Sequence, residues 1–151
     1  MDPTRPVVKL CVEGMQAEMD GRHVDAKALF LQAWAAREDA FDACIAAHYV
    51  ARHQNTPEDA LRWNQLALSE AEAVGDERVQ GFFSSLYLNI GYSHEVLGDL
   101  VSARRFYDLA AERLGDVPDG RYRQIVEHGI VKGSWRVEAG ESEGIRPGSK
   151  S

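Results

Sequence analysis

The 151-residue chain has two cysteines, Cys11 and Cys44, and no apolar run near the roughly 20 residues that a membrane-spanning helix needs. Its first residues, MDPTRPVVKL, lack a basic segment followed by a long apolar stretch, so we expect no signal peptide. Lysine and arginine together number 17, against 24 acidic residues. The formal net charge of −7 argues against nucleic acid or an anionic membrane as the main partner. We expect a cytoplasmic protein whose two thiols are reduced and buried.

Signals of catalysis are also missing. The sequence contains neither the G-x-S-x-G motif of a serine nucleophile nor a glycine-rich phosphate loop. His48 and His53 are five residues apart, which is an awkward offset for two ligands on one helical face, while His94 and His128 are isolated. We therefore expect a protein that is not an enzyme and that needs no metal ion or cofactor.

What the chain does contain is the composition of a globular protein, with 44% hydrophobic and 27% charged residues. Its most regular stretch is Leu86–Ala110, LYLNIGYSHEVLGDLVSARRFYDLA, which predicts two amphipathic helices around a turn at Gly98-Asp99. The small residue Gly91 is followed by Ala103, Tyr107 and Ala110 at distances of 12, 16 and 19 residues. Small residues at this spacing let two antiparallel helices approach closely, and the aromatic ring fills the wedge between successive hairpins.

The same spacing recurs near the N-terminus. Gly14 is followed at 12, 16 and 19 residues by Ala26, Phe30 and Ala33, with Gly21 in the turn. A middle unit keeps only the alanines Ala60 and Ala67. It has His48 at the small position, Asn64 at the aromatic position and Asn55-Thr56-Pro57 in place of the glycine turn, and Trp63, one residue earlier than Asn64, is a candidate for the aromatic role.

These patterns resemble the tetratricopeptide repeat (TPR) family. The insertion around Glu70–Arg78 resembles the longer repeat variants of about 40 residues. The resemblance covers residues 7–137 and implies an all-α, right-handed superhelix of three helical hairpins plus a C-terminal capping helix. Units are expected at residues 7–40, 41–75 and 77–117, with the cap at 120–137. The domain would thus span residues 1–139, and the polar, Gly/Ser-rich residues 140–151 are predicted to be a disordered tail.

The pattern predicts seven helices. They are expected at Pro6–Met19, His23–Arg37, Ala40–Gln54, Pro57–Val74, Glu77–Leu97, Leu100–Leu114 and Gly120–Val137. Pro57 suits a first helical turn after Thr56 as N-cap, and Gly75 suits a helix C-cap. Trp135 is expected to close the last hairpin.

In the family, the first helix of each hairpin lines a concave groove. Carried onto this chain, the resemblance implies a partner-binding groove of apolar and aromatic residues with two cations. Its members are Met15, Met19, Ile45, Tyr49, Arg52, His53, Leu88, Tyr92 and Glu95. Methionine adapts to irregular partners and tyrosine offers rigid area with a polar tip, so both types suit peptide recognition.

The resulting hypothesis is a non-enzymatic scaffold that binds another protein, through a peptide or a helix laid in this groove. Two alternatives stay open at the level of sequence. The apolar groove could be buried against a second copy in a homodimer, or the domain could sense a small peptide as bacterial TPR regulators do. The sequence does not name the partner.

Overall fold

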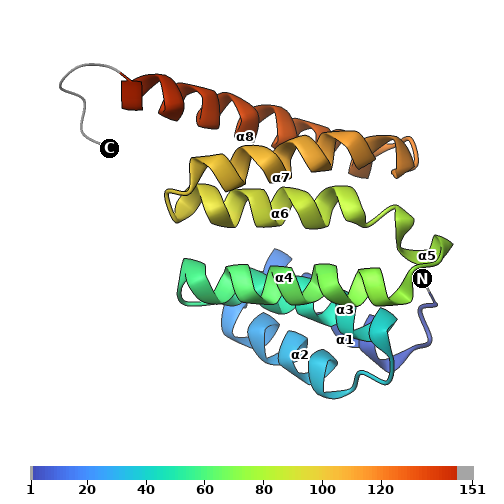
Figure 1. Cartoon of the computed structure of the whole chain (residues 1–151). Helices are drawn as coiled ribbons and strands as arrows, with labels where there is room; N and C mark the ends of the chain where they lie inside the picture. The colour runs from blue at the N-terminus through green and yellow to red at the C-terminus, as the bar shows by residue number, and fades with distance from the viewer. Residues whose placement is uncertain (1, 146–151) are drawn as a thin grey trace. The chain divides into compact units, whose positions relative to one another are not determined.

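The computed structural model describes residues 2–145, with side chains as far as Glu141. The described residues are helical and contain no strand. The helices are α1 (Pro6–Met19), α2 (His23–Ala35), α3 (Ala40–Val50), α4 (Pro57–Val74), α5 (Glu77–Gln80), α6 (Phe83–Val96), α7 (Leu100–Arg113) and α8 (Arg121–Ile145) (Figure 1). Short 3-10 turns follow α3 and α7, at Ala51–His53 and Leu114–Asp116. The chain forms two compact units, Met1–Val79 and Gln80–Ser151, whose boundary falls within α5.

The helix ends follow from local sequence. The Thr56 side chain accepts a hydrogen bond from the backbone N–H of Asp59 and caps α4, whose first residue is Pro57. Gly75 ends α4 with a φ of 66°, as predicted for this position. Gly21 and Gly98 turn the first and third hairpins with φ values of 77° and 84°, a region that glycine enters without steric cost.

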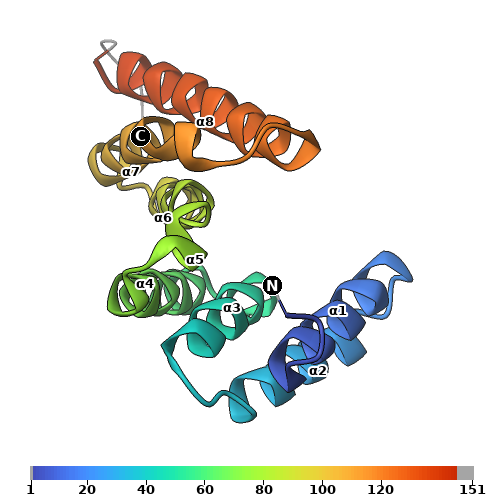
Figure 2. The same cartoon turned by 90° about the vertical axis from the view of Figure 1, so that its right-hand side faces the viewer.

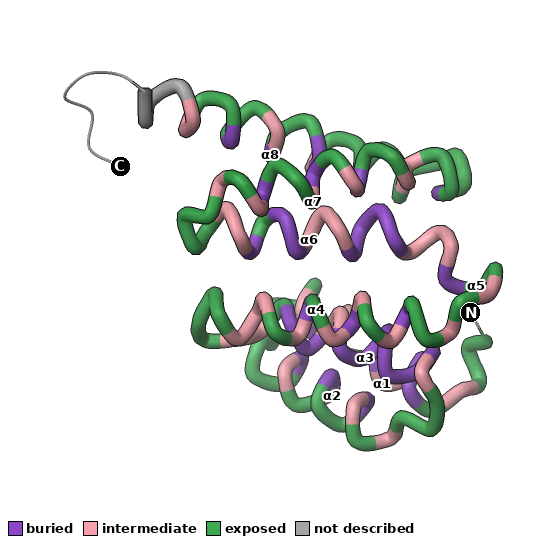
Figure 3. The backbone as a smooth tube through the Cα atoms, in the orientation of Figure 1, coloured by how far each residue is buried: buried purple, intermediate pink, exposed green. Residues whose placement is uncertain are grey.

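The first unit consists of two hairpins, α1 with α2 and α3 with α4. In the first hairpin Phe30 is fully buried against Gly14, where an added Cβ would lie 2.3 Å from the ring. Helix α3 is buried along most of its length, which the colouring of Figure 3 marks. The Arg5 guanidinium joins the start of α1 to α3, because its Nε donates to the Asp42 carboxylate at 3.0 Å.

The second hairpin differs from the first in the sizes of two side chains. At the positions that match Gly14 and Phe30 it has His48 and Asn64. Asn64 is buried and His48 is half-buried. Burial, together with the charge of Arg52, lowers the pKa of the His48 imidazole to about 4, so the ring is neutral at pH 7.

The tryptophans pack differently from the sequence-based expectation. Trp63 does not take the aromatic position, because Asn64 itself occupies that buried place. The Trp63 ring instead meets Trp34 of α2 edge-on, with the ring centroids 5.0 Å apart. Trp135 does not close the last hairpin either, since 62% of it is exposed.

The second unit is the hairpin of α6 and α7, covered by α8 (Figures 1 and 2). Tyr107 of α7 is buried between two glycines, Gly91 of α6 and Gly133 of α8. A Cβ on Gly133 would lie 2.4 Å from Tyr107 Cζ. Helix α8 also buries Val126 and Ile130 against Ala110 and Val137 against Tyr107, so its apolar stripe faces the hairpin.

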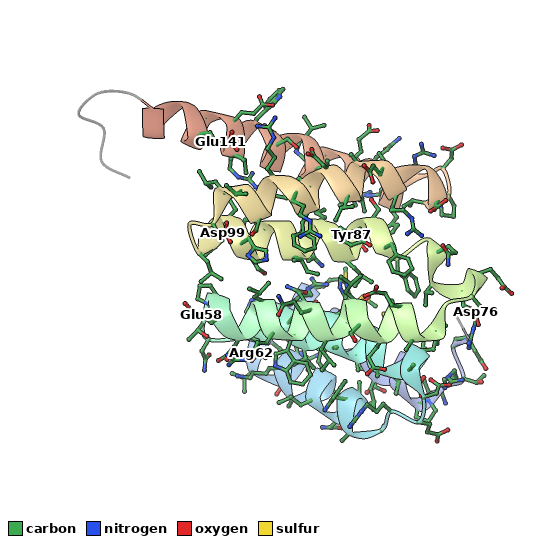
Figure 4. All side chains as sticks on the ribbon, in the orientation of Figure 1. Glu58, Arg62, Asp76, Tyr87, Asp99 and Glu141 are labelled. Carbon is green, nitrogen blue, oxygen red and sulfur yellow. The ribbon has the colours of Figure 1, made fainter. Side chains whose placement is uncertain are left out.

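Two predicted helices differ most from the structure. The helix expected at Glu77–Leu97 is broken between α5 and α6, at Gly81 and Phe82, and glycine is a poor interior helix residue. The last helix runs to Ile145 instead of ending at Val137, so residues 140–145 are not a disordered tail. Gly140 fits against Leu100, and Glu141, labelled in Figure 4, forms an ion pair with Arg104 at 3.0 Å. Residues 146–151 of the predicted tail lie outside the described residues.

Within residues 2–145, no helix combines the length and the apolar character that crossing a membrane requires.

The close fit of Tyr107 against α8 gives a stability prediction. We expect Gly133→Ala to lower the free energy of unfolding by about 1–3 kcal/mol, because the new methyl group overlaps a fully enclosed ring. Denaturant unfolding measures this loss. Gly115→Ala is the control, since its Cβ would have no atom within 4 Å. Equal stability of the two variants would contradict the packing described for Tyr107.

Candidate functional site

A glutamate one helical turn after Gly91 connects three helices of the second unit. Tyr107 donates its hydroxyl proton to Glu95 Oε1 at 2.6 Å. Arg136 of α8 donates to both oxygens of the same carboxylate, from Nε at 2.7 Å and from Nη2 at 3.1 Å. The carboxylate therefore fixes α6 to α7 and to α8 through charge-assisted hydrogen bonds.

The first unit repeats this arrangement with other residues. Glu18 stands four residues after Gly14, as Glu95 does after Gly91. It pairs with Arg52 at 3.1 Å and with Nε2 of His53 at 2.7 Å, and both partners follow α3. Each unit thus uses a glutamate of its first helix to hold a cation that lies in, or directly after, the helix that follows the hairpin.

The two glutamate–arginine pairs match in exposure as well. The side chains of Arg52 and Arg136 are 47% and 48% exposed, while those of Glu18 and Glu95 are 14% and 16% exposed. Each carboxylate is therefore shielded while its guanidinium stays on the surface. Burial acts to raise the pKa of Glu95, but the hydrogen bonds from Arg136 and Tyr107 outweigh it, and the pKa falls below its ordinary value.

Along the second unit, α6 and α8 share an exposed strip of surface. Three contacts join the two helices in matching order. Tyr122 donates its hydroxyl proton to Ser85 Oγ at 2.8 Å, Leu88 packs against Gly129, and the Arg136 guanidinium lies 5.8 Å from the centre of the Tyr92 ring. We call this strip the α6–α8 face. Its exposed members are Tyr92, Val96, Tyr122, Ile125, Lys132 and Arg136, and its floor is formed by the buried Ser85 and the half-buried Leu88 and Gly129.

The α6–α8 face exposes large apolar and aromatic side chains. Ile125 is 59% exposed, Tyr92 54%, and Tyr122 and Val96 50% each. Single exposed apolar residues are common on protein surfaces, but neighbouring ones gathered on one strip mark an interaction surface. The tyrosines supply rigid area at little entropic cost, and the arginine supplies hydrogen-bond donors.

Three residues of the predicted groove lie on or beside this face. Tyr92 is exposed there, and Leu88 is partly buried in its floor. Glu95 holds Arg136 and Tyr107, so it acts in the site by positioning the arginine.

The other six predicted groove residues belong to the first unit. Met19 is 81% exposed and Met15 is half-buried. The Tyr49 ring stacks on Phe30 with the centroids 5.1 Å apart, and Arg52 lies 5.6 Å from its centre. His53 is largely enclosed by its pairing with Glu18. Ile45 is the one correction in this group, because only 5% of it is exposed and it serves in packing.

One continuous groove would have to run from the first unit to the second. That arrangement stays a prediction, as does the joint use of Tyr49 and Tyr92 by one partner.

The candidate nucleophiles and metal ligands are placed as follows. Cys11 and Cys44 are free, buried thiols, as predicted, and burial raises the pKa of each to about 12. Cys44 and His48 stand one helical turn apart on α3. Among the described residues, however, no group of three metal-binding side chains comes together.

The contribution of α8 to the site was not predicted from the sequence. This helix was expected to be a cap, without site residues. The signal was present, since Ile125, Gly129, Lys132 and Arg136 follow Tyr122 by 3, 7, 10 and 14 residues and so share one helical stripe. A second signal is the sequence Gly-x-x-x-Glu, which occurs in both well-matched units, at residues 14–18 and 91–95.

Comparison with known proteins agrees with this architecture. No protein-family model matches the chain, and a search of curated proteins finds no significant match. Among solved structures, the crystal structure of the Sgt2 TPR domain from Aspergillus fumigatus is similar, with 20% sequence identity and a TM-score of 0.62. The similarity covers 99% of this chain and 90% of that chain. The chain thus has an all-α, TPR-like fold, as the sequence predicts.

The role of Glu95 gives a pH-dependent prediction. Because its pKa is lower in the folded state, its charge stabilises the fold at neutral pH, and this contribution is lost as the pH falls through the folded pKa. We expect Glu95→Gln to cost about 1–2 kcal/mol at pH 7 and progressively less as the pH falls through the folded pKa, which lies below the usual value of 4.5. Denaturant unfolding at pH 7 and pH 3.5 measures the difference. Glu138→Gln, an exposed change on α8, is the control. A cost independent of pH would refute a role for the charge.

Proposed function

We propose that the chain is a non-enzymatic protein-interaction module that binds a segment of a partner protein on the α6–α8 face. The observation that carries the proposal is the group of four exposed apolar and aromatic residues, Tyr92, Val96, Tyr122 and Ile125, beside the positioned guanidinium of Arg136. The TPR-like fold supports it, because stacked helical hairpins present rigid surfaces on which a partner is bound.

The stiffness of this face favours binding. Leu88 meets Gly129 and Tyr122 is tied to Ser85, so the two helices that form the face hold each other in place. A preformed surface loses little conformational entropy when a partner arrives. Binding of a partner by this face needs no catalytic group.

We also propose the cytoplasm as the compartment of this protein. Both cysteines are free and lie in the core, where a reducing environment would keep them as thiols.

Selection of peptides from a displayed random library tests the proposal directly. We expect peptides that bind the chain and that lose at least about 2 kcal/mol of binding free energy, roughly 30-fold in Kd, when Tyr92 and Ile125 are both replaced by alanine. Titration of labelled peptide by fluorescence anisotropy gives the Kd. Circular dichroism and thermal unfolding check that the variant stays folded.

Val101→Ala is the matched control, because Val101 is 82% exposed but lies on α7, outside the α6–α8 face. Selected peptides that bind the double variant as tightly as the native chain would place the binding surface elsewhere and reject the α6–α8 face.

A further inference from the structure

The second helices of the three hairpins, α2, α4 and α7, each expose a stripe of four residues on the side away from their first helix. The repeat itself defines the stripe. Its members stand two residues before and two, five and nine residues after the small residue at the hairpin contact, which is Ala26, Ala60 or Ala103. Every position of the three stripes is exposed, whereas Ala26 and Ala103 are fully buried.

These equivalent stripes differ in chemistry. In α4 the stripe is polar, and it consists of Glu58, Arg62, Gln65 and Ser69, of which the first two are labelled in Figure 4. In α7 it begins with Val101 and continues with Arg105, Asp108 and Glu112. In α2 it holds no polar side chain. This third set, which we call the α2 stripe, consists of Val24, Ala28, Leu31 and Ala35.

The repeat does not require apolar residues at these positions, because α4 and α7 expose polar ones there. Val24 is nonetheless 85% exposed and Leu31 is 41% exposed. The outward side of a surface helix is normally polar. A wholly apolar stripe on only one of three equivalent helices therefore indicates a surface that another molecule covers.

The spacing and the sizes of the α2 stripe indicate which molecule this is. Its members are separated by 4, 3 and 4 residues, the spacing of the seam along which two helices pack in a coiled coil. Large and small side chains alternate along it. If α2 of a second copy lies antiparallel, Val24 meets Ala35 of that copy. Leu31 meets Ala28 in the same way, so each large side chain faces a small one and the seam fills evenly.

The residues beside the α2 stripe are compatible with this pairing. Asp25 and Gln32 flank it on one side. Lys27 and Trp34 flank it on the other. In the antiparallel arrangement each charged residue faces the uncharged member of its own flank in the second copy, so no like charges meet. The helix is already formed within its hairpin, so association does not bear the cost of nucleating it.

We propose that the chain forms a homodimer in which the α2 stripes of two copies pack antiparallel about a two-fold axis. This surface lies on a different helix from those of the α6–α8 face, and the inference does not depend on the proposed function. A dimer would carry two α6–α8 faces. It would therefore bind a partner with two matching segments more tightly than one copy does, because the second contact is intramolecular.

Analytical ultracentrifugation of the full chain tests the proposal. We expect the mass of the native chain to rise from one copy to two as its concentration increases. Val24→Glu/Leu31→Glu should weaken the dimer at least about tenfold, because it places carboxylates in the apolar seam. The control is Val101→Glu/Ala111→Glu, which adds the same charge at exposed positions of α7 and should leave the dimer unchanged. Circular dichroism and thermal unfolding check that each variant stays folded.

A further pair of changes tests the orientation of the two helices. Val24→Glu and Ala35→Lys should each weaken the dimer when made alone. Combined in one chain, they should restore most of the lost affinity, because antiparallel copies place each new carboxylate against a new ammonium group. Parallel copies would bring like charges together instead.

Other results would overturn the inference. A native chain that stays monomeric up to about 1 mM would reject the dimer. A dimer that tolerates Val24→Glu/Leu31→Glu but is lost in Ile125→Asp would place the second copy on the α6–α8 face. A dimer that the combined variant fails to restore would reject the antiparallel arrangement. Peptide binding by the α6–α8 face should persist in the monomeric variant, so the proposed function is tested separately.

Discussion

The structure depends on the contact of an aromatic ring with a glycine on a neighbouring helix. Phe30 lies on Gly14, and Tyr107 lies between Gly91 and Gly133, at distances that leave no room for a methyl group. Two helices can then approach closely while a large ring fills the space beside them, which combines tight packing with extensive burial of apolar surface. Because the ring of Tyr107 touches α6 and α8 together, the same contact that closes the hairpin also fixes the helix that follows it.

The side chains that stabilise the second unit lie next to those of the proposed binding face. The turn that begins at Gly91 ends at Glu95, whose carboxylate receives both the hydroxyl of the buried tyrosine and the guanidinium that reaches the surface. An exposed arginine is normally free to adopt many rotamers, and ordering it on binding costs free energy. Here that ordering takes place during folding. The core therefore determines where a surface donor stands.

The sequence was informative about the elements and less so about the site. Spacings of small and aromatic residues located the hairpins, and the bounds Pro6–Met19 and Pro57–Val74 agree residue for residue with the structure. The extension of α8 to Ile145 was missed because it depends on tertiary contacts, such as that of Glu141 with Arg104. The break at Gly81 and Phe82 instead coincides with a residue of low helix propensity. Ile45 was misplaced because a position inferred from a repeat pattern does not reveal what packs over it. The residues of α8 were not predicted because the buried stripe that identifies a capping helix does not reveal what its other sides expose.

The different side-chain sizes in the second hairpin have a consequence for how the chain finds its own partners during folding. Repeat proteins are prone to misassembly, since helices of one repeat resemble those of another. Helix α3, with His48 where the other hairpins have glycine, would collide with the aromatic ring of α2 or α7 if it paired there in the same register. Helix α4, with Asn64 in place of a ring, would leave a void against α1 or α6. Pairing of α3 with α4 avoids both mismatches, so these two side chains distinguish the middle hairpin from its neighbours and disfavour domain swapping.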